Sequence, residues 1–213
     1  MLDYKGVIFD MDGTLLDSMY VWEKIDIDFL ARRGIEVPED YMHSISHLGA
    51  YETALYTIER FDLNDTPEGL IREWIDMAVA EYAYVPLKSG ASEYISYLKE
   101  NGIKIAIATA SEPEIVKAAL CGRSFAKDID YIATVNDVKR GKGFPDIYLK
   151  CAEKLGLSVE ECIVYEDILT GVKGALAGGF KTIAMYDKHS EKSKREIMDI
   201  ASGYIYNFME MIR

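Results

Sequence analysis

The sequence predicts an α/β fold in which a doubly wound parallel sheet carries an inserted helical unit. Short apolar runs rich in β-branched residues recur along the chain, and amphipathic segments with helical spacing follow them. One stretch, residues 17–85, breaks this rhythm because it contains helical patterns and no convincing strand. The alternation predicts a sheet with helices on both faces, and the break in it predicts the insertion.

Six apolar runs are the strand candidates. The first, Val7-Ile8-Phe9, consists of β-branched and aromatic residues and ends at Asp10. The other five runs span residues 103–108, 131–134, 162–165, 181–185 and 203–206. Helical spacing of apolar residues between these runs is shown by Ala91, Tyr94, Ile95 and Leu98, and again by Tyr148, Cys151, Ala152 and Leu155. Gly102 and Gly156 follow these two segments and are typical helix stops.

The inserted stretch contains three further apolar helix faces. The first holds Trp22, Ile25 and Phe29, and we expect Trp22 to be buried with the other two. The second and third faces hold Ala54, Thr57, Ile58 and Phe61, and Ile71, Trp74, Ile75 and Ala78. The chain returns towards the sheet at residues 85–90. Residues 1–16 and 86–213 are therefore expected to form a Rossmann-like core, and residues 17–85 a helical domain inserted after the first strand.

Composition and charge exclude several classes of protein. The chain has 213 residues, 24 Lys and Arg, 36 Asp and Glu, and a net charge of −12, which is ordinary globular composition. The sequence contains no 18-residue apolar stretch of the kind that would predict a membrane span. Its first residues lack the apolar segment of a signal peptide. Strong acidity disfavours nucleic acid as a partner. We expect a cytoplasmic protein, and nothing in the sequence indicates an obligate protein partner.

Cysteine and histidine offer little chemistry. Cys121, Cys151 and Cys162 are widely spaced and odd in number, so we expect reduced, buried thiols rather than a disulfide framework or a zinc site. The three histidines show no metal-ligand spacing such as HExxH. Any catalysis must therefore depend mainly on carboxylates.

Polar residues follow four of the predicted strands. Asp10-Met11-Asp12-Gly13-Thr14 follows the first strand, Thr109-Ala110-Ser111 the second, and Glu166-Asp167 the fourth, while Arg140-Gly141-Lys142 lies in the loop beyond the third. Each piece alone has an ordinary structural explanation as a helix cap, a solvated turn or a surface lysine. Together they would share one rim, because ligand-binding groups gather at the carboxyl ends of parallel strands.

This set of side chains suits phosphoryl transfer. Clustered carboxylates repel one another unless a hard cation neutralises them, and Mg²⁺ prefers oxygen ligands of this kind. Lys142 can offset charge on a phosphoryl group, and the Thr109 hydroxyl can donate to one of its oxygens. One carboxylate can attack phosphorus while a second, two residues further on, handles the proton. Gly13 permits a tight turn that directs main-chain amides at the phosphoryl oxygens.

These motifs resemble the haloacid dehalogenase superfamily, in the group that includes β-phosphoglucomutase and many small-metabolite phosphatases. The resemblance spans essentially the whole chain and includes VIFDMDGTLLDS, IAIATAS, GKGFPDIYLKCAEKLG and CIVYEDILTGVKGALAGG. It implies that Asp10 is the nucleophile and Asp12 the general acid/base. Magnesium would be held by Asp10, the Asp12 carbonyl and Asp167, with Glu166 in or beside its shell. Thr109, Ala110 and Lys142 would bind the phosphoryl group, and residues 17–85 would be a mobile cap.

The resemblance predicts a magnesium-dependent phosphatase of a small phosphorylated metabolite, acting through an aspartyl-phosphate. A sugar-phosphate mutase is one alternative, but Trp22 stands where the mutase has a cap histidine, and the arginine for its second phosphate is missing around residues 49–52. Phosphonate hydrolysis would need a cap lysine, for which Lys24 is the single candidate. A phospho-accepting receiver or a catalytically silent binding module is the non-enzyme alternative.

The substrate-facing side of the insertion is less well specified by sequence. Candidates for the cleft are Tyr20, Trp22, His47, Tyr51 and Glu52. Residues 17–85 contain 15 acidic and 5 basic residues, whereas the rest of the chain contains 21 and 19. We interpret this acidity mainly as a solvated helical surface. The alternative interpretation is that it disfavours substrates carrying a second anionic group.

Overall fold

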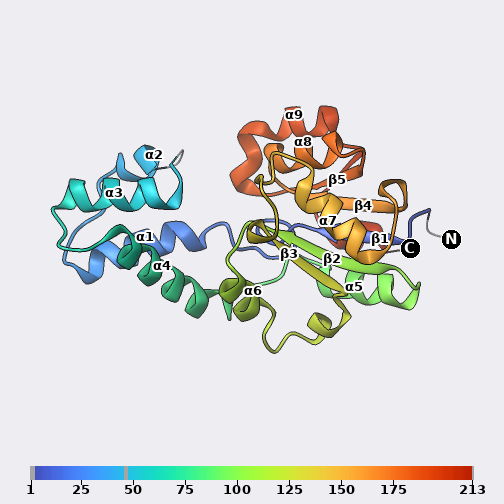
Figure 1. The fold of residues 1–213 in the computed structure, drawn as a ribbon, viewed down its shortest axis with the longest axis horizontal. Coiled ribbons are helices and arrows are strands. Elements are labelled where there is room, and N and C mark those ends of the chain that lie inside the picture. Colours follow the sequence, from blue (N-terminus) through green and yellow to red (C-terminus); the bar gives the residue numbers. More distant parts are fainter. Residues whose placement is uncertain (1–2, 46–47, 213) are drawn as a thin grey trace.

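The protein is built on one six-stranded sheet (Figure 1), here described from a computed structural model that covers residues 3–45 and 48–212. The strands lie in the order β3-β2-β1-β4-β5-β6, and every pair of neighbours is parallel. Their bounds are β1 Gly6–Phe9, β2 Lys104–Thr109, β3 Tyr131–Thr134, β4 Cys162–Glu166, β5 Lys181–Met185 and β6 Gly203–Ile205. The predicted parallel sheet is confirmed, and β1 lies at its centre.

The strand ends differ slightly from the predicted runs, and two differences concern functional residues. Thr109 is the last residue of β2, and Glu166 is the last residue of β4. Thr109 is paired in register with Thr134 of β3, and Glu166 with Ala184 of β5. Both side chains are therefore fixed by the sheet itself rather than by the loops that follow.

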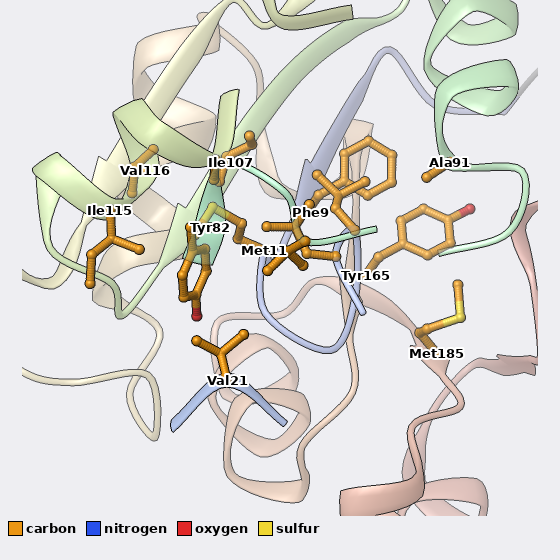
Figure 2. Close-up of a cluster of buried hydrophobic side chains, with 14 of the residues drawn as sticks. Phe9, Met11, Val21, Tyr82, Ala91, Ile107, Ile115, Val116, Tyr165 and Met185 are labelled. Carbon is orange, nitrogen blue, oxygen red and sulfur yellow. The ribbon is translucent and has the colours of Figure 1, made fainter. Parts of the chain in front are cut away.

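Side chains of the central strand alternate between the two faces of the sheet. Val7 and Phe9 belong to one buried cluster, in which the Phe9 ring stacks on Tyr165 at 5.1 Å between centroids (Figure 2). Ile8 belongs to a second cluster together with Tyr148 and Phe180. Because both faces of β1 are buried, the sheet is doubly wound, as the sequence predicts.

Five helices of the core connect the strands. They are α5 Ala91–Glu100, α6 Pro113–Leu120, α7 Asp146–Leu155, α8 Leu169–Ala177 and α9 Lys194–Ile200. Short 3₁₀ turns, η1 Ser124–Asp128, η2 Val135–Asp137, η3 Val159–Glu161, η4 Lys188–Ser193 and η5 Phe208–Met211, complete the connections. Helix α5 supplies Ala91, Tyr94, Ile95 and Leu98 to the Phe9 cluster, and α7 supplies Ile147, Tyr148 and Cys151 to the Ile8 cluster. The two helices therefore cover opposite faces.

Four helices between β1 and α5 form a separate group, on the left in Figure 1. They are α1 Val21–Arg32, α2 Tyr41–Ile45, α3 Ala50–Phe61 and α4 Pro67–Tyr82, and α4 packs against both α1 and α3. Helix α4 begins with Pro67 in its first turn, and the Thr66 hydroxyl accepts the Gly69 amide at 3.1 Å. In the described part of residues 17–85, every regular element is a helix.

Two expectations about burial are wrong. Ile25 and Phe29 are buried, but Trp22 is 42% exposed, because at the beginning of α1 it lines a cavity instead of packing in the core. Cys121 is exposed because it follows the last residue of α6 at the surface, whereas Cys151 and Cys162 are buried free thiols as predicted.

The two chain segments that join this helical group to the sheet run side by side. Leu16 and Leu87 form an antiparallel bridge. On either side of it, the Asp17 amide donates to the Pro86 carbonyl and the Lys88 amide donates to the Leu15 carbonyl, both at 2.9 Å. The outgoing and returning segments thus form a short two-stranded connection beside the carboxyl end of β1. No helix in the described ranges, 3–45 and 48–212, is long and apolar enough to cross a membrane.

Candidate active site

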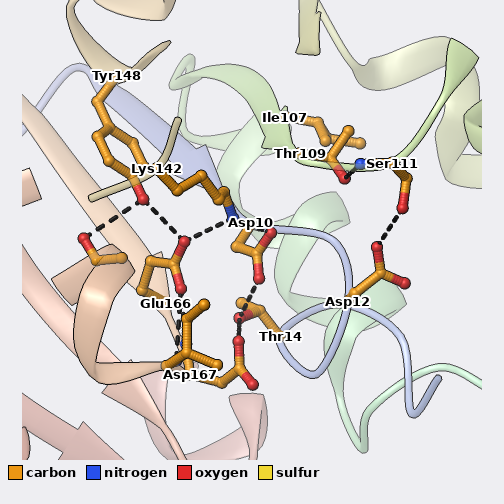
Figure 3. Close-up of polar contacts among 12 residues, drawn as sticks. Asp10, Asp12, Thr14, Ile107, Thr109, Ser111, Lys142, Tyr148, Glu166 and Asp167 are labelled. Atoms are coloured by element: carbon orange, nitrogen blue, oxygen red, sulfur yellow. Dashed lines mark hydrogen bonds and ion pairs between the residues drawn. The ribbon is translucent and has the colours of Figure 1, made fainter. Parts of the chain in front are cut away.

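Three sequence-distant segments meet at the carboxyl end of the sheet (Figure 3). Asp10 directly follows β1, Glu166 and Asp167 come from the end of β4, and Lys142 comes from the loop before α7. All four side chains are at least nine-tenths buried. The central position of β1 between β2 and β4 places Asp10 in the middle of this group.

Lys142 is the cation of the cluster. Its Nζ donates to Asp10 Oδ1 in a short contact and to Glu166 Oε1 at 2.6 Å. The Tyr148 hydroxyl also donates to Glu166 Oε1, at 2.8 Å, and the Asp167 amide donates to Glu166 Oε2 at 3.2 Å. Glu166 thus accepts hydrogen bonds from the Lys142 loop, from α7 and from the residue that follows β4, and it fixes the lysine that contacts Asp10.

Asp167 has a different environment from Glu166. The Thr14 hydroxyl lies between Asp10 Oδ2 at 3.3 Å and Asp167 Oδ1 at 3.2 Å. The other oxygen, Asp167 Oδ2, is buried and has no hydrogen-bond partner among the described residues. Gly13, at φ +81°, packs against it so closely that a Cβ there would stand 2.2 Å from Asp167 Oδ2. A glycine is therefore required at this turn for both its φ and its space.

The three carboxylates fit a divalent cation. One oxygen each from Asp10, Glu166 and Asp167 lies within 4.8 Å of the others. Three buried carboxylates face one ammonium group, so the cluster carries excess negative charge when all are ionised. An unpartnered buried oxygen on Asp167 and an all-oxygen donor set suit Mg²⁺.

The electrostatics of the cluster follow from burial and crowding. Burial, and next the Glu166 carboxylate, raise the pKa of Asp10 to about 7 despite the opposing effect of Lys142. Burial, with Asp10 and Glu166, also raises the pKa of Asp167 well above its ordinary value. Burial lowers the pKa of Lys142, but the two carboxylates it contacts outweigh this and raise it overall. The lysine therefore stays charged while the carboxylates compete for its charge.

Asp12 points away from this cluster. Its Oδ1 accepts the Ser18 hydroxyl at 2.7 Å and the Tyr82 hydroxyl at 2.6 Å, and its Oδ2 accepts the Ser111 hydroxyl at 2.7 Å. Ser18 lies on the outgoing connection, Tyr82 is the last residue of α4, and Ser111 lies between β2 and α6. Neutral donors from three separate segments thus hold the Asp12 carboxylate.

The β2–α6 loop provides the remaining predicted residues. The Thr109 hydroxyl oxygen accepts the Ser111 amide at 3.0 Å, which shapes the turn, and the Thr109 side chain is buried. Ala110 is exposed and lines the same cavity as Asp10, Asp12 and Lys142. The residues chosen from the strand ends are therefore brought together in one site.

A cavity of about 360 Å³ lies between these residues and the helical group. The core side contributes Asp10, Asp12, Ala110, Ser111, Glu112, Ile115, Lys142 and Ile168, and the other side contributes Ser18, Met19, Trp22, Ala50, Ile71, Trp74, Ile75 and Tyr82. The volume suits a small metabolite. The carboxylate of Asp10 and the ammonium of Lys142 lie at one end of an otherwise largely apolar enclosure.

Of the side chains predicted to face the substrate, some line the cavity and others do not. Trp22 lines the cavity, whereas Tyr20 lines a separate one beside Lys88 and Asp187. Tyr51 and Glu52 are exposed and are not among the lining residues, and His47 lies outside the described residues. Lys24 also lies away from the cavity, because it is paired with Asp28 at 2.7 Å and Glu81 at 2.6 Å.

Sequence reasoning missed four contributors to the site. Tyr82, Tyr148 and Ser18 hold the carboxylates of Asp12 and Glu166, and Thr14 bridges Asp10 and Asp167. Ser18 and Thr14 fall within the quoted VIFDMDGTLLDS motif, so their proximity to Asp10 was the available signal. Nothing in the local sequence distinguishes Tyr82 or Tyr148 from other buried tyrosines.

Comparisons with known proteins identify a family and several relatives of this chain. Residues 4–179 match the family model described as haloacid dehalogenase-like hydrolase. The chain is 31% identical over 186 residues to hexitol phosphatase A of Escherichia coli, covering 85% of this chain and 82% of the relative. It is 27% identical over 184 residues to the fructose-1-phosphate phosphatase YqaB of the same organism, covering 84% and 95%. Among solved structures, CbbY from Rhodobacter sphaeroides in complex with xylulose-(1,5)bisphosphate superposes with a TM-score of 0.80, at 24% identity and 98% and 96% coverage.

Magnesium should stabilise the protein, and more so at higher pH. The raised pKa of Asp10 means that the folded protein binds this proton more tightly than the unfolded chain, so the metal-free protein loses stability as pH rises from about 4 to about 7. A divalent cation replaces the proton and removes this penalty. We expect thermal unfolding to show a larger Mg²⁺-dependent increase in Tm at pH 7.5 than at pH 5.

Asp167→Asn provides the matched control. It removes one of three mutually repelling carboxylates, so the metal-free variant should unfold at an equal or higher temperature than the parent at pH 7.5 while its response to Mg²⁺ is lost. An unchanged Mg²⁺ response in this variant would contradict the assignment of the cation site.

Gly174→Ala should disturb the position of Lys142. Helix α8 approaches the Lys142 loop so closely that a Cβ at Gly174 would lie 2.0 Å from the Lys142 carbonyl oxygen. The loop must move, which we expect to lower the affinity for inorganic phosphate by about tenfold or more. Gly141→Ala, in the same loop with no atom near the added Cβ, should leave it unchanged. Phosphate titration by calorimetry in the presence of Mg²⁺ compares the two.

Proposed function

We propose that this chain, which belongs to the haloacid dehalogenase-like hydrolase family, is a magnesium-dependent phosphatase. Its proposed substrate is a small sugar phosphate or a related metabolite. The observation that carries the proposal is the buried arrangement of Asp10 between Lys142 and Asp167, open to a cavity on one side. A nucleophilic carboxylate needs a cation beside it to approach an anionic phosphoryl group, and this geometry supplies one from the chain.

The residues suited to hold magnesium are Asp10, Asp167 and the main-chain carbonyl of Asp12, with Glu166 beside them. When bound, the ion would neutralise charge on the phosphoryl oxygens and on the carboxylates themselves. Glu166 contributes chiefly by holding Lys142, since both of its oxygens already accept hydrogen bonds.

The reaction divides into two displacements at phosphorus. Asp10 attacks, forming a bond between its carboxylate oxygen and phosphorus, while the bond from phosphorus to the leaving alcohol breaks and Asp12 gives that oxygen a proton. Asp12 then takes a proton from water as the water oxygen attacks phosphorus. The Asp10–phosphorus bond breaks, inorganic phosphate is released, and both aspartates return to their initial protonation states.

The surroundings of the two aspartates support this assignment. Asp10 is buried against Lys142, which would offset the charge transferred to phosphorus, while Ala110 lines the cavity and follows the buried Thr109, whose hydroxyl shapes the same loop. Asp12 lines the same cavity but is bound by neutral hydroxyls. Two carboxylates in unlike environments are what an acid/base and a nucleophile require.

The helical group of residues 17–85 would act as a cap that encloses the leaving group. Two relatives are named hexitol phosphatase and fructose-1-phosphate phosphatase, which supports a sugar phosphate as the proposed substrate. The mutase alternative gains no support, because Trp22 offers an indole at the position where that resemblance requires a histidine. Phosphonate hydrolysis gains none either, because Lys24 is committed to two carboxylates away from the cavity.

Asp10→Asn should abolish turnover. The amide is not a nucleophile towards phosphorus, so we expect Mg²⁺-dependent hydrolysis of fructose 1-phosphate to fall by about a thousandfold or more. Release of inorganic phosphate measures the rate, and circular dichroism verifies folding. Asp199→Asn, at an exposed position on α9, should retain parental activity. Near-normal hydrolysis by Asp10→Asn would refute the mechanism.

Tyr82→Phe should identify the contribution of the Tyr82 hydroxyl to positioning Asp12. Deleting this hydroxyl keeps the buried ring but removes the 2.6 Å donor to Asp12 Oδ1. We expect kcat to fall by about tenfold with little change in KM, because proton transfer rather than substrate binding is affected. Tyr41→Phe removes an equally buried hydroxyl, bonded to Thr57 at 2.8 Å, and should leave kcat unchanged. Equal effects of the two substitutions would show that Tyr82 has only a structural role.

A further inference from the structure

The wall that the helical group contributes to the cavity is apolar. Among the described residues, its side chains are those of Ser18, Met19, Trp22, Ala50, Ile71, Trp74, Ile75 and Tyr82. Ile71, Trp74 and Ile75 form one face of α4, and Trp22 faces the cavity from the beginning of α1. Trp22 is 42% exposed and Trp74 6% exposed, so the indole ring of Trp22 is the more accessible of the two.

The lysine that lines the cavity is already paired with carboxylates. Lys142 is the one lysine or arginine among its lining residues, within the described ranges, and its ammonium contacts both Asp10 and Glu166. It lies at the reacting end, where the transferred phosphoryl group would bind. A second phosphate at the far end of a substrate would therefore find no ammonium or guanidinium group supplied by these lining residues.

The cations of the helical group are also directed elsewhere. Lys24, Arg33, Arg60 and Arg72 each form ion pairs with carboxylates at 2.5–2.8 Å, and none of them lines the cavity. Arg32 lies at the exposed end of α1, three turns from Trp22. Recruiting any of the four paired cations would require breaking an existing pair.

One lining side chain would repel a second phosphate. Glu112 lines the cavity from the core side, and its Oε2 accepts a hydrogen bond from Asn136 Nδ2 at 3.0 Å. The residues 17–85 that form the opposite wall contain 15 acidic and 5 basic residues. A second anionic group that leaves water for this enclosure would lose hydration without gaining a further lysine or arginine among the lining residues that the structure describes.

We propose that the substrate carries one phosphate and an uncharged leaving group whose C–H face packs on Trp22 and on the Ile71–Ile75 face of α4. This inference rests on the proposed phosphatase function and narrows it to monophosphates. The fold does not by itself restrict the substrate to a monophosphate, because the solved CbbY structure, which has the same fold, is in complex with a bisphosphate. The preference for monophosphates would arise from the side chains that line the cavity of this chain. Their apolar wall can contact the carbon skeleton of a sugar or polyol but offers no partner to a second charged group.

A matched pair of substrates tests the inference directly. Steady-state hydrolysis of fructose 1-phosphate and fructose 1,6-bisphosphate is measured with the full chain and saturating Mg²⁺. We expect kcat/KM for the bisphosphate to be lower by about tenfold or more. Equal or higher kcat/KM for the bisphosphate would overturn the inference.

Introducing a cation tests the physical cause. Ile75→Arg places a guanidinium group on the apolar wall, and we expect it to reduce the preference for the monophosphate by about tenfold. Leu55→Arg adds the same charge on the exposed surface of α3, away from the cavity, and should leave the preference unchanged. The same change of preference in both variants would overturn the local explanation, because it would show that net charge alone controls selection.

Trp22→Ala tests the packing contact. We expect KM for fructose 1-phosphate to rise by about tenfold, while hydrolysis of acetyl phosphate, whose leaving group is small, stays within about twofold of the parent. Parallel loss on both substrates would overturn the assignment of Trp22 to the leaving group. Failure of the parent chain to hydrolyse any of these phosphates with Mg²⁺ would instead refute the proposed function itself, and this inference with it.

Discussion

The burial of three carboxylates around one ammonium group is the constraint on which the rest of this site depends. Asp10, Glu166 and Asp167 lie at the carboxyl ends of two adjacent strands, and Lys142 contacts two of them. Such a cluster is costly in a dry interior, because its negative charge exceeds its positive charge. The unpartnered Asp167 Oδ2 marks where the excess lies. A divalent cation would resolve this imbalance, so the charge excess that destabilises a metal-free cluster would also favour the binding of the proposed metal.

The position of Lys142 depends on how its loop is held. The Nε and Nη2 atoms of Arg140 donate to the Asp146 carboxylate, at 3.0 and 2.6 Å. The Arg140 guanidinium also lies 4.5 Å from the Phe144 ring centroid. On the inner side, Gly174 of α8 allows the helix to pack directly on the loop backbone. The loop that bears Lys142 is therefore held by contacts on two sides. These contacts keep the Lys142 ammonium between Asp10 and Glu166 although the residue does not belong to a strand.

The sequence was sufficient for the features that follow from parallel topology. Because parallel strands end at one edge, residues such as Asp10 and Asp167 could be placed together without knowledge of side-chain contacts. Trp22 was misassigned because its spacing matches the buried face of α1, and helical periodicity cannot tell a core contact from a cavity at the helix end. Tyr82 was missed because its partner, Asp12, lies 70 residues away. Its local pattern predicts burial and says nothing about the hydroxyl.

Two aspartates that are two residues apart acquire different chemistry because the turn after β1 sends their side chains in different directions (Figure 3). Asp10 enters a charged cluster, where burial and other carboxylates raise its pKa. Asp12 meets hydroxyl groups, two of which belong to the residues flanking the connection to the helical group. Hydroxyl donors orient the Asp12 carboxylate without adding a charge beside it, whereas Asp10 is held by the fixed charge of Lys142. Gly13, in the same turn, has a positive φ and approaches Asp167 so closely that an added Cβ would meet its carboxylate, so the turn that carries both aspartates also packs on the proposed cation site.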